Sequence, residues 1–295
     1  MTAVLYDLTL HMGYAYDTPA SGARHIMRLM PLSLPNRQRL VAGSISISPQ
    51  PDEQSHFVDF FEHPATSFLL RSPHETLDIR MQARVQVESQ AISADFSPLL
   101  AELPEDVAGI WSLDPGSPHH FLGDSPRLTE TKIISEYART CIQPSLTVIQ
   151  IAYALCARIN EDFTYDSEAT SVETTPLEAF KLKRGVCQDF THIMILALRS
   201  LGIPAGYVSG FLRTIPPPGK ERLEGADAMH AWVRVWCGET AGWIELDPTN
   251  NIPAGTDHIV VAYGRDYADV APVIGVLKSY GSQRSVQAVD VIPLK

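Results

Sequence analysis

The period of the hydrophobic pattern changes once along the chain, and this change limits the folds that the chain can adopt. Up to about residue 95, apolar and polar residues alternate, most strictly over Ser44–Ser48 and Leu77–Val87. Such alternation places one face of a β-strand on a core and the other in solvent. Prolines recur between these runs and exclude a long helix there. The first third therefore predicts an antiparallel, β-sandwich-like domain.

Beyond residue 130 the apolar residues recur at steps of three and four, which is typical of helices packed on a core. Helices are predicted over residues 131–142, 145–160 and 187–201, followed by strands over 207–212, 230–236, 243–247, 259–263 and 286–292, with a loop over 214–226. Gly202 and Pro204 end the third helix, because glycine favours helix C-termini and proline cannot continue the helix. The whole chain is predicted to be α+β.

Residues 96–126 are rich in proline and glycine and resemble a connecting segment rather than part of a core. A chain of 295 residues also exceeds the commonest domain size. We therefore expect two domains. Residues 1–115 would form the β-rich domain with its linker, and residues 116–295 a core that includes the C-terminal strands.

Charge and cysteine content exclude several classes of protein. The formal net charge is -11 and no basic run occurs, which argues against nucleic-acid and membrane partners. We expect no membrane span and no signal peptide, because no apolar run approaches about 20 residues and the N-terminus lacks a basic segment before an apolar one. The four cysteines are widely spaced, which disfavours zinc ribbons and disulfide frameworks. These features predict a cytoplasmic protein.

Cys187 is predicted to lie at the start of the third helix, after Gly185. The thiolate is the nucleophilic form of cysteine, and two features stabilise it. One is the positive end of a helix dipole, and the other is a histidine that carries the proton. The sequence offers the first at Cys187, so the histidine must be brought near by the fold.

His230 and Asp247 complete a candidate catalytic set. If their strands pair around a turn centred between Gly238 and Glu239, these two residues lie directly opposite each other, with Cβ atoms about 4.5–5.5 Å apart. The carboxylate could then orient the imidazole as the third member of a catalytic triad does. The longer loop up to Gly242 leaves a slip of one or two residues open. A cysteine, a histidine or an aspartate alone would more often be structural.

Five segments of the sequence resemble the transglutaminase-like superfamily. These are Arg184–His192 (RGVCQDFTH), Leu201–Ala205 (LGIPA), Tyr207–Gly210 (YVSG), Asp227–Trp232 (DAMHAW) and Gly242–Asn250 (GWIELDPTN). The segments Arg24–Pro31, the strand ending at Val87 and His258–Asp269 are similar to the bacterial subgroup, in which a β-rich region precedes this core. The resemblance implies a papain-like core with the cysteine helix packed on an antiparallel sheet.

The resemblance also implies the roles of the residues. Cys187 would be the nucleophile, His230 the general base and acid, and Asp247 the orienting carboxylate, without a metal or an organic cofactor. The expected activity is acyl transfer on a peptide or protein amide bond through a thioester, with hydrolysis by a peptidase or amidase favoured because bacterial proteins of this layout are described as cysteine proteases. Transglutaminase cross-linking and a non-catalytic protein-binding scaffold remain alternatives. The sequence does not fix the oligomeric state.

Further residues are candidates for supporting roles. Lys181 stands where papain-type enzymes carry an oxyanion-hole glutamine, so we expect the N–H of Cys187 and the hydroxyl of Tyr165 as oxyanion donors, although Tyr165 would suit ordinary packing as well. Trp232, Asp189 and His192 are candidates for shaping the site, or alternatively for satisfied core positions. A zinc site of Cys187, His192, His230 and Asp247 would match no usual ligand spacing.

Overall fold

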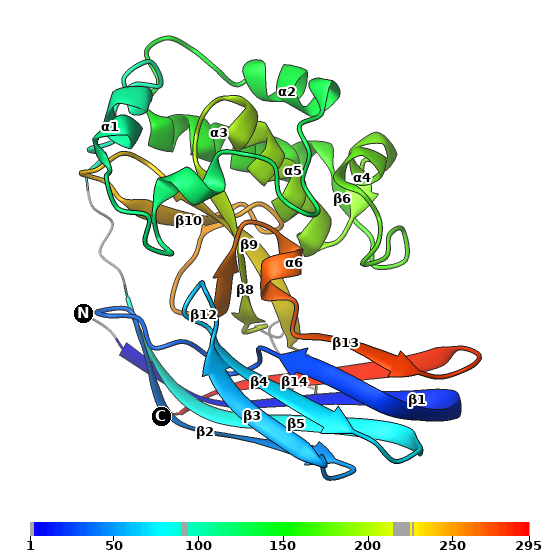
Figure 1. The fold of residues 1–295 in the computed structure, drawn as a ribbon. Coiled ribbons are helices and arrows are strands. Elements are labelled where there is room, and N and C mark those ends of the chain that lie inside the picture. Colours follow the sequence, from blue (N-terminus) through cyan, green and yellow to red (C-terminus); the bar gives the residue numbers. More distant parts are fainter. Residues whose placement is uncertain (1–2, 90–93, 215–224, 226, 295) are drawn as a thin grey trace, which may run out of the picture.

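The computed structural model describes residues 3–89, 94–214, 225 and 227–294. The chain forms a large antiparallel sheet, which lies beneath a helical layer built on a second sheet (Figure 1). The α+β prediction is confirmed. Most of the loop predicted over residues 214–226 lies outside the described residues.

The large sheet has seven strands in the order β2-β5-β1-β4-β3, with β13 and β14 also paired to β1. Its strands are β1 (Ala3–Met27), β2 (Gln38–Ser48), β3 (Glu53–Val58), β4 (Pro64–Leu70), β5 (His74–Glu88), β13 (Val273–Lys278) and β14 (Gln283–Leu294). Alternate side chains of β1, including Tyr6, Leu8 and Leu10, are buried. The period-two alternation therefore marks the buried face of a sheet, as expected from strand geometry.

The last two strands, β13 and β14, belong to the large sheet and not, as had been predicted from the sequence, to the core. β14 pairs with β1 from Leu5 to Tyr16, and β13 pairs with its later half from Ser21 to Met27. Alternation shows that a strand has one buried face but does not identify the sheet that it joins. The chain therefore returns to its first strand after it has built the core.

The core contains a second antiparallel sheet of five strands, in the order β11-β10-β9-β8-β12. These strands are β8 (Ala205–Leu212), β9 (Ala228–Trp236), β10 (Trp243–Asp247), β11 (Ile252–Pro253) and β12 (His258–Gly264). The other elements are α1 (Leu103–Gly109), η1 (Pro118–Phe121), α2 (Lys132–Arg139), α3 (Val148–Asp162), β6 (Thr164–Tyr165), α4 (Pro176–Leu182), β7 (Arg184–Gly185), α5 (Cys187–Ser200) and α6 (Tyr267–Val270).

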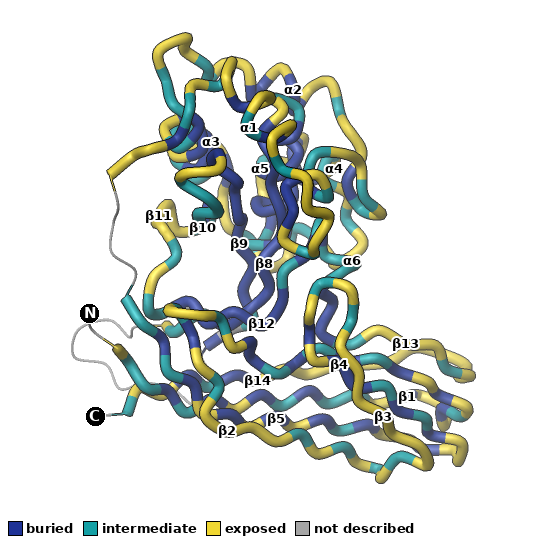
Figure 2. The backbone as a smooth tube through the Cα atoms, turned by 60° about the vertical axis from the view of Figure 1, so that its left-hand side comes forward, coloured by how far each residue is buried: buried dark blue, intermediate teal, exposed yellow. Residues whose placement is uncertain are grey.

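Helix α5 is the central helix of the core. It packs on β8 and β9 and is flanked by α2, α3 and α4. The buried tube of Figure 2 runs through α5 and the strands beneath it. Phe190, Ile193 and Ala197 are 2% exposed or less, as their helical spacing predicted. Leu201 caps the helix and Gly202 follows it with a φ of 78°, a conformation that glycine adopts without strain.

The proline-rich segment is more than a connection, which corrects the sequence prediction. It forms α1 and η1, and the side chains of Leu103 and Phe121 are fully buried. Phe121 lies 5.1 Å from the ring of Trp243. Prolines at the start of both elements are compatible with helical turns, because the first N–H groups of a helix have no partner within it.

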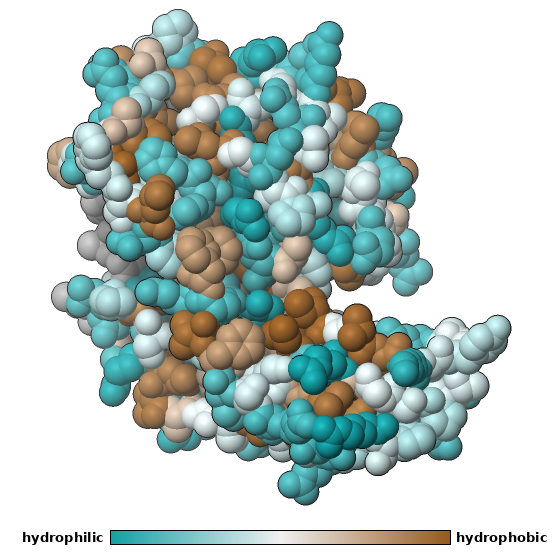
Figure 3. Space-filling view, in the orientation of Figure 1, coloured by the Kyte–Doolittle hydropathy of each residue, from teal (hydrophilic) through white to brown (hydrophobic). Residues whose placement is uncertain are grey.

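A short segment after β1 joins the large sheet to the core. The amide of Gln38 donates to the carbonyls of Leu32 and Val260 at 2.8 Å, and its oxygen accepts from the N–H of Val260 at 2.8 Å. Arg37 forms a bidentate ion pair with Glu245. Beyond this junction the sheet projects past the core, and the surface above it is hollowed (Figure 3).

Candidate active site

Cys187 is the first residue of α5, as the sequence predicted. The short parallel pair of β6 and β7 brings Tyr165 level with Gly185, and the chain then enters the helix through Val186. Asp189 accepts from the N–H of Val186 at 2.8 Å, so it caps the N-terminus from its third position. The thiol is partly exposed and lies where the N–H groups of a helix start are free to act as donors.

His230 lies between the thiol and a buried carboxylate. Its Nε2 bonds to Oδ2 of Asp247 at 2.8 Å, and the Cys187 side chain also interacts with the ring and raises its pKa. Since Nε2 faces the carboxylate, Nδ1 is left for the thiol. Burial lowers the pKa of His230, but the bonds to Asp247 and Cys187 outweigh it and raise the pKa to about 10. The surroundings therefore favour an imidazolium beside the sulfur.

Asp247 is fully buried and accepts five hydrogen bonds. Oδ1 accepts from the N–H groups of Thr249 (2.9 Å) and Asn250 (3.2 Å), while Oδ2 accepts from His230 (2.8 Å), His258 (3.2 Å) and the Asn250 side chain (2.7 Å). Burial alone would raise the pKa of Asp247, but the hydrogen bonds from the two histidines hold it well below its usual range. The carboxylate stays ionised and can stabilise the charge on His230.

The predicted pair is brought together, and the strand register slips by two residues, a displacement that the sequence left open. Glu245 pairs with Arg234 rather than with Trp232, because the turn is longer than assumed and closes through a bond from the N–H of Cys237 to the carbonyl of Gly242 at 2.8 Å. His230 and Asp247 are therefore diagonal rather than opposite. The displacement is even, so both side chains remain on one face.

Comparisons with known proteins identify the family of this chain. The model of the transglutaminase-like superfamily matches residues 135–248, and that of the bacterial transglutaminase-like N-terminal region matches residues 6–86. An uncharacterised protein of Mycobacterium tuberculosis is 36% identical over 273 residues, which cover 88% of this chain and 83% of that protein. One of Mycobacterium leprae is 31% identical over 274 residues, which cover 92% of each.

The chain belongs to the transglutaminase-like superfamily. A solved structure described as a putative cysteine protease from Cytophaga hutchinsonii has the same fold, with a TM-score of 0.75 and 20% identity over 100% of this chain and 92% of that one. The protein thus has a transglutaminase-like fold. The roles of Cys187, His230 and Asp247 in this chain stay predictions.

Two of the supporting candidates of this transglutaminase-like protein each interact with one of these three residues. Trp232 is fully buried, and its ring is stacked 6.1 Å from that of His230 at 27°. Tyr165 is exposed, and its pKa is raised first by partial burial and then by the charge of Cys187. Tyr165 is therefore influenced by the charge of Cys187, and its oxyanion role stays a prediction.

The other two supporting candidates maintain the structure around α5. Asp189 caps α5 and also accepts from the hydroxyl of Thr170 at 2.7 Å. Burial raises the pKa of Asp189. His192 faces the other way, with its ring 5.2 Å from that of Tyr207 and its Nε2 accepting from the N–H of Tyr267 at 3.3 Å. It thus links α5 to α6 and is a satisfied core residue.

His258 is the residue that the sequence reasoning missed. Among the described residues, the groups that could surround a metal ion are those of His230, Asp247 and His258, and neither Cys187 nor His192 belongs to this set. The zinc site considered from the sequence is therefore not assembled. Oδ2 of Asp247 already accepts three hydrogen bonds, which an ion would have to displace. The polar residue at the start of the apolar run over 259–263 was the available signal.

No helix in the described parts of the chain is both long enough and apolar enough to cross a membrane.

Proposed function

We propose that this protein is a cysteine peptidase or amidase that cleaves amide bonds through a thioester acyl-enzyme. The observation that supports the proposal most directly is the position of His230. Its ring interacts with the Cys187 thiol, which helps to raise its pKa, and its Nε2 is held by a buried carboxylate. A raised pKa of a histidine beside a partly exposed cysteine is the arrangement that generates a thiolate near neutral pH.

Acylation begins with attack of the Cys187 thiolate on the carbonyl carbon of the amide. A C–S bond forms, and the oxygen carries the negative charge of the tetrahedral intermediate. Free N–H groups at the start of α5 and the hydroxyl of Tyr165 stabilise that charge in this proposal. The His230 imidazolium then protonates the nitrogen, the C–N bond breaks, and the amine leaves a thioester on Cys187.

Deacylation reverses the roles of the proton carriers. The neutral His230 ring removes a proton from water, the hydroxide oxygen bonds to the thioester carbon, and the C–S bond breaks to release a carboxylic acid. An amine in place of water would form a new amide, which is the transglutaminase alternative. We propose a peptide or protein amide as the substrate and the cytoplasm as the setting, since a reducing compartment keeps the thiol usable.

Alkylation tests the activated thiol without knowledge of the substrate. Iodoacetamide at about pH 6 should modify Cys187 far faster than a model thiol, whose pKa of about 8.5 leaves little thiolate at that pH. Burial raises the pKa of Cys156 to about 12 and also raises that of Cys237, so neither should compete. Cys141 is partly exposed and is replaced in a Cys141→Ala background. Reaction of Cys187 at the rate of a model thiol would contradict the proposal.

Mass spectrometry of peptide mixtures identifies the reaction. The Cys141→Ala protein is incubated with peptides beside the Cys141→Ala/Cys187→Ala protein, which lacks the nucleophile. New peptide termini that require Cys187 indicate a peptidase, glutamine-to-glutamate conversion indicates an amidase, and cross-linked peptides indicate a transglutaminase. Identical products from both proteins would favour a binding scaffold and would refute the enzymatic proposal.

A further inference from the structure

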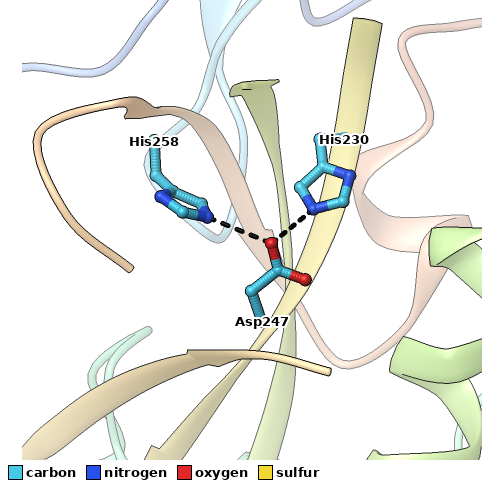
Figure 4. Close-up of side chains that lie close together, drawn as sticks. All are labelled: His230, Asp247 and His258. Atoms are coloured by element: carbon cyan, nitrogen blue, oxygen red, sulfur yellow. Dashed lines mark hydrogen bonds and ion pairs between the residues drawn. The ribbon is translucent and has the colours of Figure 1, made fainter. Parts of the chain in front are cut away.

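His258 donates a hydrogen bond to the same oxygen of Asp247 that accepts from His230 (Figure 4). The two rings approach this oxygen from different sides, with Nε2 of His258 at 3.2 Å. His258 begins β12 and is 2% exposed. A buried imidazole aimed at the carboxylate of a proposed catalytic set needs a reason beyond packing, because an apolar side chain would fill the same space without a polar group to satisfy.

The other ring nitrogen of His258 fixes its tautomer. The N–H of Gly255 donates to Nδ1 of His258 at 3.2 Å, so Nδ1 carries no proton. A neutral imidazole then holds its proton on Nε2, which makes His258 a hydrogen-bond donor to Asp247. The bond from the N–H of His258 to the carbonyl of Gly255 at 3.0 Å closes the same turn, so the ring has little freedom to turn away.

The surroundings hold the His258 ring from several sides. The fully buried ring of Trp232 lies edge-on to it at a centroid distance of 5.1 Å and also stacks on His230. Trp232 is in turn fixed by a bond from its Nε1 to Glu245 at 2.5 Å. The first strand of the chain reaches this place as well, since the hydroxyl of Tyr6 bonds to Asp257 at 2.9 Å.

We propose that His258 is a positioning residue, which fixes the Asp247 carboxylate so that its Oδ2 points at Nε2 of His230. This inference rests on the proposed function of Cys187, His230 and Asp247. A carboxylate held by His258 on one side cannot rotate away from His230 when the imidazolium gives up its proton. The large sheet also holds this part of the chain in place. Tyr6 of β1 bonds to Asp257, and Gln38 of β2 bonds to Val260, so the chain is held on both sides of His258.

Two substitutions separate this role from a purely structural one. In His258→Gln, the amide nitrogen reaches the place of Nε2 and can still donate to Asp247. In His258→Asn, the shorter amide matches the place of Nδ1, so it can accept from the N–H of Gly255 but cannot reach Asp247. If His258 positions Asp247, Cys187 should react in His258→Gln as it does in the wild type, but not in His258→Asn. If His258 only holds the turn at Gly255, Cys187 should react as in the wild type in His258→Asn, but not in His258→Gln.

The rate of Cys187 alkylation by iodoacetamide, measured against pH in the Cys141→Ala background, is the readout. We expect His258→Asn to react about tenfold more slowly at about pH 6, which is the effect of one lost hydrogen bond to a charged group, and its rate to recover as the pH rises. His258→Gln should stay within about threefold of the parent protein. Equal rates for the two variants, or a faster rate for His258→Asn, would overturn the inference.

An Asp247→Asn variant keeps this test distinct from a failure of the proposed function. If the parent protein reacts no faster than a model thiol and Asp247→Asn changes nothing, the proposed function fails. If Asp247→Asn slows alkylation but both His258 variants react like the parent protein, only the positioning role fails. Thermal unfolding of each variant shows whether it is folded, and an unfolded His258→Asn beside a folded, active His258→Gln would still support the bond to Asp247.

Discussion

His192 provides a quantitative test of the structure, because its imidazole lies in the core without an ionised partner in contact. Its ring is 2% exposed, and Nε2 accepts from the N–H of Tyr267 at 3.3 Å. Burial lowers the pKa of His192 to about 4, although the charge of Asp266 acts in the opposite direction. The free energy of unfolding should therefore depend on pH through this residue.

The sign follows from the two pKa values. The unfolded chain binds a proton at His192 below about pH 6.5, whereas the folded chain does not do so until about pH 4. Between these values the unfolded state holds more protons, so the stability contributed by this residue falls as the pH falls. The loss relative to about pH 8 is about 2 kcal/mol at pH 5 and about 3 kcal/mol at pH 4.

Urea denaturation of the wild type and of His192→Gln measures this loss. Glutamine retains an oxygen that can accept from the N–H of Tyr267 but does not titrate. Other groups, among them His230 with its raised pKa, contribute equally to both proteins, so their effects cancel in the difference. We expect the wild type to lose about 2 kcal/mol more than the variant between about pH 8 and pH 5. Parallel curves within about 0.5 kcal/mol would contradict a lowered pKa of His192 in the folded protein.

Three further predictions concern the junction, the second sheet and the candidate site. Arg37→Met should lower the free energy of unfolding by about 3–5 kcal/mol, because it leaves the buried Glu245 carboxylate without its cation; urea denaturation measures this, and a second change of Glu245 to glutamine should restore part of it. Gly210→Ala should cost about 1–3 kcal/mol through overpacking, since its Cβ would overlap the facing strand; Gly109→Ala, where a Cβ meets nothing within 4 Å, is the control, and equal melting temperatures would contradict the crowding. Because the pKa of His230 is raised to about 10, the rate of amide cleavage should decline through about pH 10 as the general acid is lost, and a decline centred near pH 6.5 would contradict the pairing.

Local patterns in the sequence determined which elements form and which residues bear the chemistry. The spacing of apolar residues predicted α5 with Cys187 at its start, and strict alternation predicted β5 and the end of β2. These features depend on residues within a few positions of one another, so no knowledge of the tertiary structure is needed to infer them. The expected strand pairing and the resemblance of the motifs to a known family then pointed to His230 and Asp247.

The tertiary structure decided which distant segments meet. The sequence could not show that β13 and β14 pair with β1, because alternation marks a buried face and carries no information about the neighbouring strand. Nor could it show that His258 shares the oxygen of Asp247 with His230, since that contact joins two strands that are not adjacent in the sheet. Contacts of this kind arise only when the whole chain folds, as the arrangement of packed elements fixes the position of each side chain.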